Sequence, residues 1–132
     1  MIFDSNIVIA LLDKAGGSSL IDLVARQSAA RGAFINEIIF AEISPRFVSP
    51  DLVIEVCEVF GFDIVPLRLA ECHRAGQAFA EYRRRGGERS AILPDFLIGA
   101  QAEIRGWPLV TRDRKGFQSY FPNLQIIDPT ED

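Results

Sequence analysis

Four acidic residues lie inside or directly after apolar stretches of the sequence, where carboxylates are unusual. They are Asp4 in IFDSN, Glu42 in IIFAEI, Asp95 in ILPDFLIGA and Asp113 in PLVTRD. A carboxylate near a hydrophobic core loses hydration and needs a hydrogen-bond donor, a cation or a proton in compensation. If the fold brings the four together, their repulsion favours a divalent cation such as Mg²⁺ or Mn²⁺, which suits phosphoryl chemistry.

Three of these acids also have ordinary structural explanations. Asp4 is placed to cap a helix, Asp95 to interact with the positive end of a helix dipole, and Asp113 to form a turn. For Asp113 alone the turn is the better explanation. The coincidence of all the acids nevertheless indicates a functional site.

Glu42 belongs to a predicted helix that Asn36 caps. It follows Ile38 by four residues and Ile39 by three, which places it on the apolar stripe of that helix. A charge in that position needs a reason. Glu37 is the alternative acid of this helix, but its place directly after the cap favours a solvent-facing role with the helix dipole.

Short apolar segments alternate with helical patterns along the chain. Predicted strands are 2–3, 33–35, 62–65, 109–111 and 124–127, and predicted helices include 18–31, 50–60, 67–85 and a segment from Pro94 to Gly106. A polar turn is expected at 113–116. This alternation predicts an α/β protein, a three-layer α/β/α sandwich with a central parallel sheet of four to five short strands. Ligands bind beyond the carboxyl ends of such strands, where Asp4 and Asp113 are expected.

The composition indicates one globular domain covering residues 1–132, because 48% of the residues are hydrophobic and 24% are charged. The net charge of −4 means that nucleic acid can bind only through a local basic patch. Cys57 and Cys72 do not make a disulfide framework, so we expect a reduced, cytoplasmic protein. No apolar run is long enough for a membrane-spanning helix, and Asp4 before the apolar run 7–12 argues against a secretory signal.

Basic residues gather in two groups, at 83–89 and at 112–115. Both flank the proposed acidic positions. Such groups often mark a solvated face or a helix end, but a basic rim around an acidic pocket also suits RNA phosphates. Arg89 and Arg112 are the predicted substrate contacts.

The single histidine and three aromatic residues are given structural roles. His73 lies within a predicted helix, far in sequence from the strand ends, and is expected to be a surface or packed residue. Phe117, Tyr120 and Phe121 could stack on nucleobases, but packing in the core or in a dimer interface is favoured.

These motifs together resemble the PIN-domain family, and in particular the VapC-like toxins of type II toxin-antitoxin pairs. The resemblance spans nearly the whole chain, through IFDSN, IIFAEI, YRRRGGERSAILPDFLIGAQA, GWPLVTRDRKGF and FPNLQIIDP. It implies a metal-dependent endoribonuclease that hydrolyses RNA phosphodiester bonds with water activated by Mg²⁺ or Mn²⁺. It also implies a cytoplasmic homodimer that a cognate antitoxin inhibits.

The resemblance assigns roles to individual residues. It implies a catalytic, metal-binding acidic cluster made of Asp4, Glu42, Asp95 and Asp113. It implies supporting polar roles for Asn6 and Thr111. Two positions depart from the family pattern, since the family often has Ser or Thr at Asn36 and often His at Gln101.

Three alternatives come from other classes of protein. A receiver-type phosphoacceptor domain also binds Mg²⁺, but it needs paired acids near the first strand and a lysine after the last, and this chain shows neither. A hydrolase of the haloacid-dehalogenase type needs a second aspartate where Asn6 stands. A non-catalytic PIN-fold interaction module does not require the four carboxylates that this chain retains.

Overall fold

The computed structural model describes residues 1–14, 17–88 and 92–129. Within these ranges the chain forms five strands, seven α-helices and one short 3₁₀ helix. In chain order they are β1 (Ile2–Phe3), α1 (Ser5–Leu12), α2 (Gly17–Ala30), β2 (Ala33–Ile35), α3 (Glu37–Ile43), η1 (Ser44–Arg46), α4 (Pro50–Phe60), β3 (Phe62–Ile64), α5 (Leu69–Arg84), α6 (Leu93–Arg105), β4 (Leu109–Val110), α7 (Arg114–Tyr120) and β5 (Ile126–Ile127).

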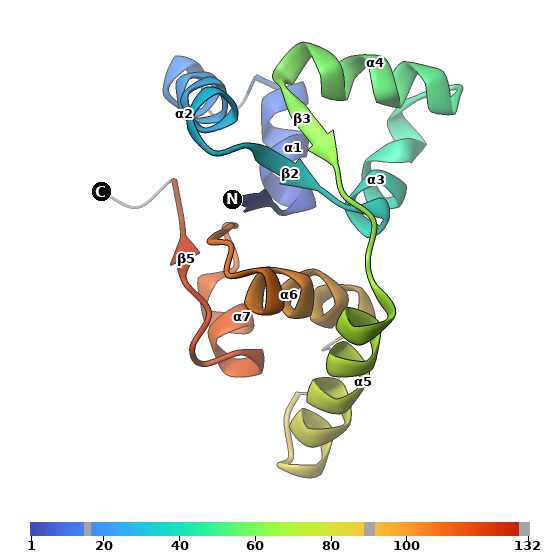
Figure 1. Ribbon diagram of the computed structural model, residues 1–132, viewed down its shortest axis with the longest axis vertical. Helices are drawn as coiled ribbons and strands as arrows, with labels where there is room; N and C mark the ends of the chain where they lie inside the picture. The colour runs from blue at the N-terminus through green and yellow to red at the C-terminus, as the bar shows by residue number, and fades with distance from the viewer. Residues whose placement is uncertain (15–16, 89–91, 130–132) are drawn as a thin grey trace.

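The strands form one sheet in the order β3-β2-β1-β4-β5, and every neighbouring pair is parallel. Helices α1 to α4 lie on one side of the sheet, and α5 to α7 lie on the other (Figure 1). The predicted three-layer α/β architecture is therefore confirmed. The strands are almost wholly apolar because helices cover both faces of the sheet.

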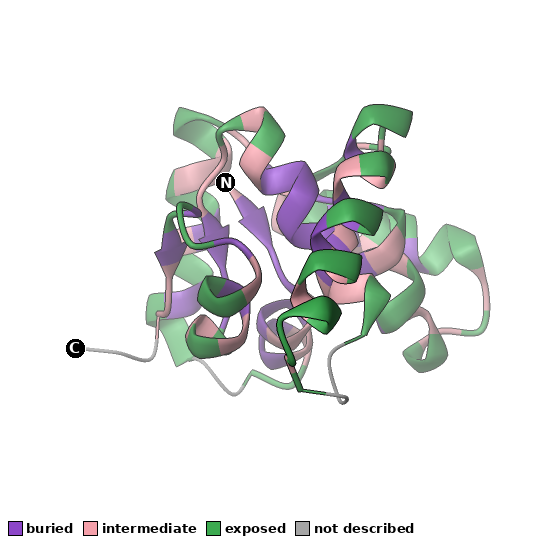
Figure 2. Ribbon diagram, turned by 90° about the horizontal axis from the view of Figure 1, so that it is seen from below, coloured by how far each residue is buried: buried purple, intermediate pink, exposed green. Residues whose placement is uncertain are grey.

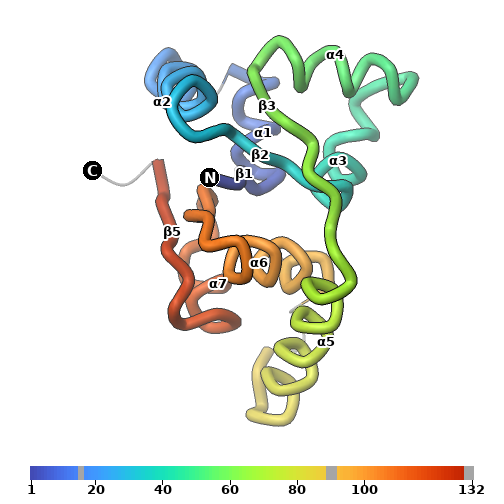
Figure 3. Tube along the Cα trace, viewed as in Figure 1, coloured from blue at the N-terminus to red at the C-terminus, as the bar shows by residue number. Residues whose placement is uncertain are grey.

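The direction of the chain connections reverses between β1 and β4. From β1 the chain moves to β2 and β3, and it then returns to the other side of β1 to form β4. Figure 3 shows the start of the chain beside the segment that leads from α6 into β4. Helices diverge at such a switch point, so the carboxyl ends of the two strands face a crevice in which ligands bind in related folds.

The core occupies the space between the sheet and the inner sides of the helices. Figure 2 shows buried residues in the strands and in the inner turns of helices, whereas the outer turns are exposed. Below the sheet, an aromatic cluster joins α5, α6 and α7. Its members are Phe79, Tyr82, Phe96, Phe117, Tyr120 and Phe121.

Helix α7 corrects a sequence-based expectation. The polar turn predicted at 113–116 continues as a helix to Tyr120. A short segment that contains Gly116 has a weak intrinsic tendency to form a helix. Burial of Phe117 and Phe121 stabilises α7 in the fold.

The strands also differ slightly from expectation. The strands predicted at 62–65, 109–111 and 124–127 are one or two residues shorter in the structure.

A buried amide pair joins α3 to α6. Asn36 Oδ1 accepts hydrogen bonds of 3.0 Å from the Ile38 and Ile39 N–H groups, so the predicted cap of α3 is confirmed. Its Nδ2 donates to Gln101 Oε1 at 2.9 Å, and Gln101 Nε2 donates to the Val65 carbonyl at 3.1 Å. Both side chains are fully buried, so this pair fixes the helix that carries Glu42 against the helix that carries Asp95.

Among the described residues, no helix combines the length and the apolar character needed to cross a membrane.

Candidate active site

Asp4 is held rigidly at the carboxyl end of β1. Its Oδ1 accepts a hydrogen bond from the Ser5 N–H at 2.8 Å, and its Oδ2 accepts one from Thr111 Oγ1 at 2.8 Å. The residue is only 6% exposed. Burial raises the pKa of the Asp4 carboxyl, the hydrogen bonds from Thr111 and Ser5 oppose this rise, and the charge of Asp113 adds to it.

Thr111 connects the ends of β1 and β4. Besides donating to Asp4, its hydroxyl oxygen accepts hydrogen bonds from Asn6 Nδ2 at 3.3 Å and from the Asp113 N–H at 3.0 Å. Asn6 Oδ1 in turn accepts a hydrogen bond from the Arg112 N–H at 3.4 Å. The structure thus places the two predicted supporting residues, Asn6 and Thr111, in one network with Asp4.

Asp95 lies in the first turn of α6, directly after Pro94, as the sequence predicted. Burial raises the pKa of Asp95 to about 6, with further contributions from the negative charges of Asp4, Glu42 and Asp113. The four carboxylates therefore act on one another electrostatically. The fold brings together the acids that the sequence singled out.

Glu42 requires a correction. Its predicted place on the apolar stripe of α3 is wrong, because Ile39 and Ile43 occupy the buried face and Glu42 is exposed. Partial desolvation still raises the pKa of its carboxyl; the side chain of Ser5 lowers this pKa, and the charge of Asp4 raises it. Glu42 thus contributes to the acidic site from its solvent side.

Asp113 forms a helix cap and also acts electrostatically on the other acids. Its Oδ1 accepts a hydrogen bond from the Gly116 N–H at 3.2 Å and caps α7. A Cβ at Gly116 would lie 2.5 Å from Asp113 Oδ2, so any larger residue there would displace the capping carboxylate. The Asp113 carboxylate nevertheless raises the pKa of both Asp4 and Asp95, so it also belongs to the acidic site.

A pocket of about 310 Å³ opens beside Asp95 and Asp113. The other described residues of its lining are Tyr82, Glu88, Lys115, Gly116, Ser119 and Tyr120. Burial raises the pKa of Tyr120 to about 12, and the nearby charge of Asp95 adds to this shift, so the phenol remains protonated at neutral pH. Sequence reasoning did not assign Tyr82 and Ser119 to the site, because only the tertiary fold brings the end of α5 next to α7.

The basic residues differ in their surroundings. Arg112 is exposed and directly follows Thr111, whereas Arg89, the other predicted substrate contact, lies outside the described residues. Arg84 and Arg85 pair with Glu81 at 2.5 and 3.8 Å on the exposed end of α5. These exposed ion pairs indicate that Arg84 and Arg85 belong to an ordinary solvated surface of α5 and do not contact a substrate.

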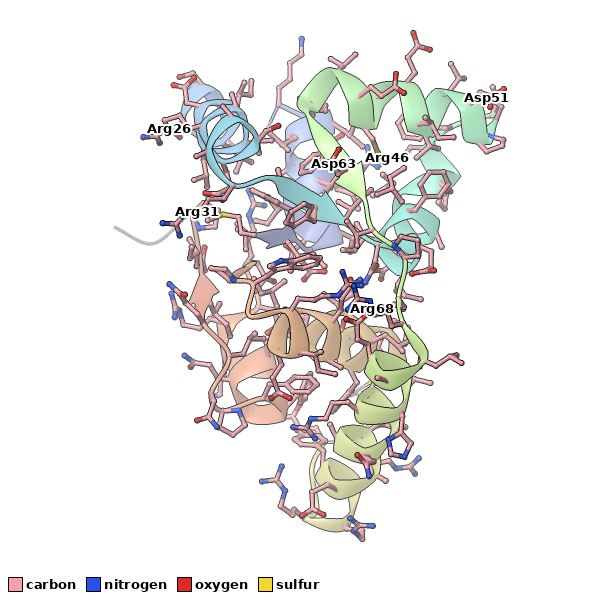
Figure 4. The ribbon with its side chains drawn as sticks, in the orientation of Figure 1. Arg26, Arg31, Arg46, Asp51, Asp63 and Arg68 are labelled. Carbon is pink, nitrogen blue, oxygen red and sulfur yellow. The ribbon has the colours of Figure 1, made fainter. Side chains whose placement is uncertain are left out.

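Two further arginines lie away from the acidic site. Arg26 on α2 and Arg31 after it point outward from the body of the protein (Figure 4). Arg26 is exposed, and its Nε donates to the Asp22 carbonyl at 3.4 Å within the same helix. These side chains are ordinary surface charges.

The donor set of the acidic site is suited to a hard divalent cation. It consists of carboxylate and hydroxyl oxygens. The raised pKa values come first from burial and then from repulsion among the carboxylates, and a cation would relieve that repulsion. In the described part of the chain, no three His, Cys, Asp or Glu side chains are already spaced to hold a metal ion. The carboxylates share one charged region but do not form a closed set of ligands.

The fold and the site define an α/β sandwich with mutually repelling carboxylates at its topological switch point. A family model described as PIN domain matches residues 1–120, and the chain therefore belongs to the PIN-domain family. A comparison with curated proteins gave no match.

Solved structures with the same fold include chains of toxin-antitoxin complexes. A chain of DNA-bound VapBC from Salmonella typhimurium has a TM-score of 0.76 and 20% identity, covering 97% of this chain and 96% of that one. VapBC2 from Rickettsia felis, bound to a DNA fragment from its promoter, has a TM-score of 0.74 and 21% identity, and the match covers 96% of this chain and 98% of that one. VapBC-1 from nontypeable Haemophilus influenzae has a TM-score of 0.73 and 20% identity, with 99% and 100% covered.

Proposed function

We propose that this chain is a Mg²⁺- or Mn²⁺-dependent endoribonuclease and acts as the toxin of a toxin-antitoxin pair. The proposal is carried by the electrostatic action of Asp4, Glu42 and Asp113 on the Asp95 carboxyl, whose pKa burial and these charges together raise to about 6. Membership of the PIN-domain family supports it. The chemistry needs no nucleophile from the protein, because phosphodiester hydrolysis can use water that a cation activates.

Asp4 and Asp95 are the proposed chief ligands of the cation, and Glu42 and Asp113 bind it directly or through water. A divalent cation at this place lowers the pKa of water and stabilises negative charge on the phosphoryl group. Asp4 is suited to its role because Thr111 and Ser5 hold both of its oxygens in place. Asp95 is half-buried and Glu42 is exposed, so both carboxylates lie closer to solvent than Asp4 does.

Other residues of the chain position the substrate. The exposed Arg112 side chain follows the network of Asn6 and Thr111 and offers a guanidinium group to RNA phosphates. The Asn6 side chain fixes the backbone at Arg112 and thereby the start of its side chain. Arg89 is proposed as a second phosphate contact.

The proposed partner is a cognate antitoxin, and the proposed assembly is a cytoplasmic homodimer. Support for the antitoxin comes from structural neighbours whose chains belong to VapBC complexes and to a toxin-antitoxin complex from Klebsiella pneumoniae. Their identities of 20 to 22% show a shared fold.

The test of the function uses the purified chain with labelled single-stranded RNA and with DNA of the same sequence. Cleavage of RNA in Mg²⁺ or Mn²⁺, its loss in EDTA and its return on adding the cation are the expected results. Cleavage that is unaffected by chelation, or no cleavage of any RNA, would contradict the proposal. The toxin role is tested separately, since induced expression of an active chain should arrest bacterial growth, and normal growth would contradict that role.

A further inference from the structure

The pocket beside the acidic site has two chemically different walls. Asp95, Asp113 and Glu88 supply the acidic side chains of the lining, and Tyr82 near the end of α5 and Tyr120 on α7 supply its aromatic side chains. Lys115 is the one basic side chain among the described residues of the lining. The volume of about 310 Å³ lies at the lower end of the range for small-molecule pockets, so it suits one nucleoside rather than a folded strand.

The aromatic wall is preorganised by the core. The Tyr120 ring stacks on Phe96 with centroids 4.3 Å apart and an interplanar angle of 27°. Tyr82 meets Tyr120 edge to face at 4.9 Å, and the Tyr82 hydroxyl accepts a hydrogen bond from the Glu88 N–H at 3.1 Å. Both tyrosines remain half-buried rather than fully enclosed. Fixed rings of this kind contact a ligand at little entropic cost.

The polar residues of the lining are not explained by core packing. Lys115 and Ser119 are exposed on α7, the helix that also carries Tyr120. An ammonium group next to an aromatic surface and hydrogen-bond acceptors matches the parts of a nucleotide, which are a phosphate, a flat base and donor groups on that base. Single-stranded nucleic acids are commonly bound by this combination of stacking and positive charge.

We propose that this pocket is a subsite for one nucleoside of single-stranded RNA next to the bond that is cut. The base contacts Tyr82 and Tyr120, and the adjoining phosphate lies at Lys115. The inference rests on the proposed ribonuclease function and adds the place at which the sequence of the RNA is read. It makes the tyrosines and Lys115 determinants of substrate binding and not of the chemical step.

The test compares two tryptophan variants of α7. Ser119→Trp places a large side chain in the pocket, whereas Gln118→Trp places it on the neighbouring exposed position outside the lining. Ser119→Trp is expected to raise both KM and the Kd for short single-stranded RNA, measured by fluorescence anisotropy in EDTA, about ten-fold, as for the loss of one stacked base. It should also change which bonds in a mixed-sequence RNA are cut. Gln118→Trp should behave as the wild type.

A second pair of variants keeps the test informative if Ser119→Trp does not fold, which thermal unfolding would reveal. Lys115→Gln should raise KM several-fold and make binding less dependent on salt, because one phosphate contact is lost. Lys14→Gln removes the same charge at the end of α1 and should change neither quantity.

The outcomes separate this inference from the function on which it rests. A wild-type chain that neither binds nor cuts RNA overturns both. A wild-type chain that cuts RNA, with unchanged KM, Kd and cleavage pattern in folded Ser119→Trp and in Lys115→Gln, overturns the subsite alone. A loss confined to kcat would also overturn it, since a binding subsite acts on KM.

Discussion

The Thr111 hydroxyl donates a hydrogen bond of 2.8 Å to Asp4 Oδ2 and thereby joins the ends of β1 and β4 at the switch point of the sheet. The bond is buried, and the same hydroxyl oxygen accepts from Asn6 and from the Asp113 backbone. One side chain thus fixes a carboxylate of the proposed cluster, an amide beside it and the start of the loop that carries another carboxylate.

Replacing Thr111 with valine should weaken both the fold and the site. Thr111→Val keeps the shape but leaves Asp4 Oδ2 without its donor, so we expect a loss of about 1–3 kcal/mol in unfolding free energy and a larger fall in RNA cleavage than stability explains. Thr111→Ser retains the hydroxyl and should keep most of the unfolding free energy and most of the RNA cleavage. Thermal unfolding and cleavage rates on the two variants check this, and equal behaviour of Val and Ser would contradict it.

Asp95 should make the metal-free protein more stable in acid. Its pKa is about 6 in the fold, against about 3.9 in an unfolded chain. The folded state therefore binds more protons between these values. The contribution of Asp95 to stability is fully present below about pH 3.9 and is lost as the pH rises through about 6.

Asp95→Asn removes this pH dependence. At about pH 8 in EDTA, the variant should be more stable than the wild type by about 1 kcal/mol, well below the full value of the shift, because the half-buried carboxyl keeps part of its hydration. At about pH 4 the advantage should disappear. Thermal unfolding at both pH values measures it, and a variant that is less stable at high pH would show that the pKa of Asp95 is not raised.

A divalent cation should reverse the repulsion among the carboxylates. Mn²⁺ in excess should raise the Tm of the wild type by several degrees at pH 8, because binding to the folded state alone stabilises it. The shift should shrink near pH 5, where Asp95 is protonated and a cation must displace that proton. No shift at either pH would contradict a cation site.

Gln101→Leu should destabilise the fold by about 3 kcal/mol, because it leaves the buried Asn36 amide without its partner and removes the donor to the Val65 carbonyl. Gln77→Leu is the matched control, since Gln77 is exposed on α5 and its replacement should cost little. Chemical denaturation of both variants provides the comparison. A Gln101→Leu variant as stable as the wild type would show that the amide pair does not hold α3 to α6.

Much of the fold followed from local patterns in the sequence. The strands are short apolar segments between helical patterns, and residues such as Asn36, Pro94 and Gly106 mark helix ends by their backbone chemistry. Asp4 and Asp95 were predicted to belong to an acidic site because their sequence surroundings are apolar. In the structure both carboxyl groups are partly or largely buried, which raises their pKa values.

The remaining features depend on tertiary contacts. Helix α7 has weak local preferences and forms because Phe117 and Phe121 are buried. The exposure of Glu42 depends on which side of α3 faces the core, and the spacing of Glu42 from Ile38 and Ile39 did not define this side. Tyr82 joins the pocket only because α5 runs back past α7, a contact that no local pattern encodes.

The most direct test of the account is the cleavage of RNA by Asp4→Asn and Asp95→Asn, with Asp63→Asn as control. Asp63 is exposed on the edge strand β3 (Figure 4), so its replacement makes the same change of charge outside the acidic site. We predict that both site variants stay folded and lose Mg²⁺- or Mn²⁺-dependent cleavage by at least about 100-fold, while Asp63→Asn cleaves as the wild type does. Undiminished cleavage by folded Asp4→Asn and Asp95→Asn would contradict the account.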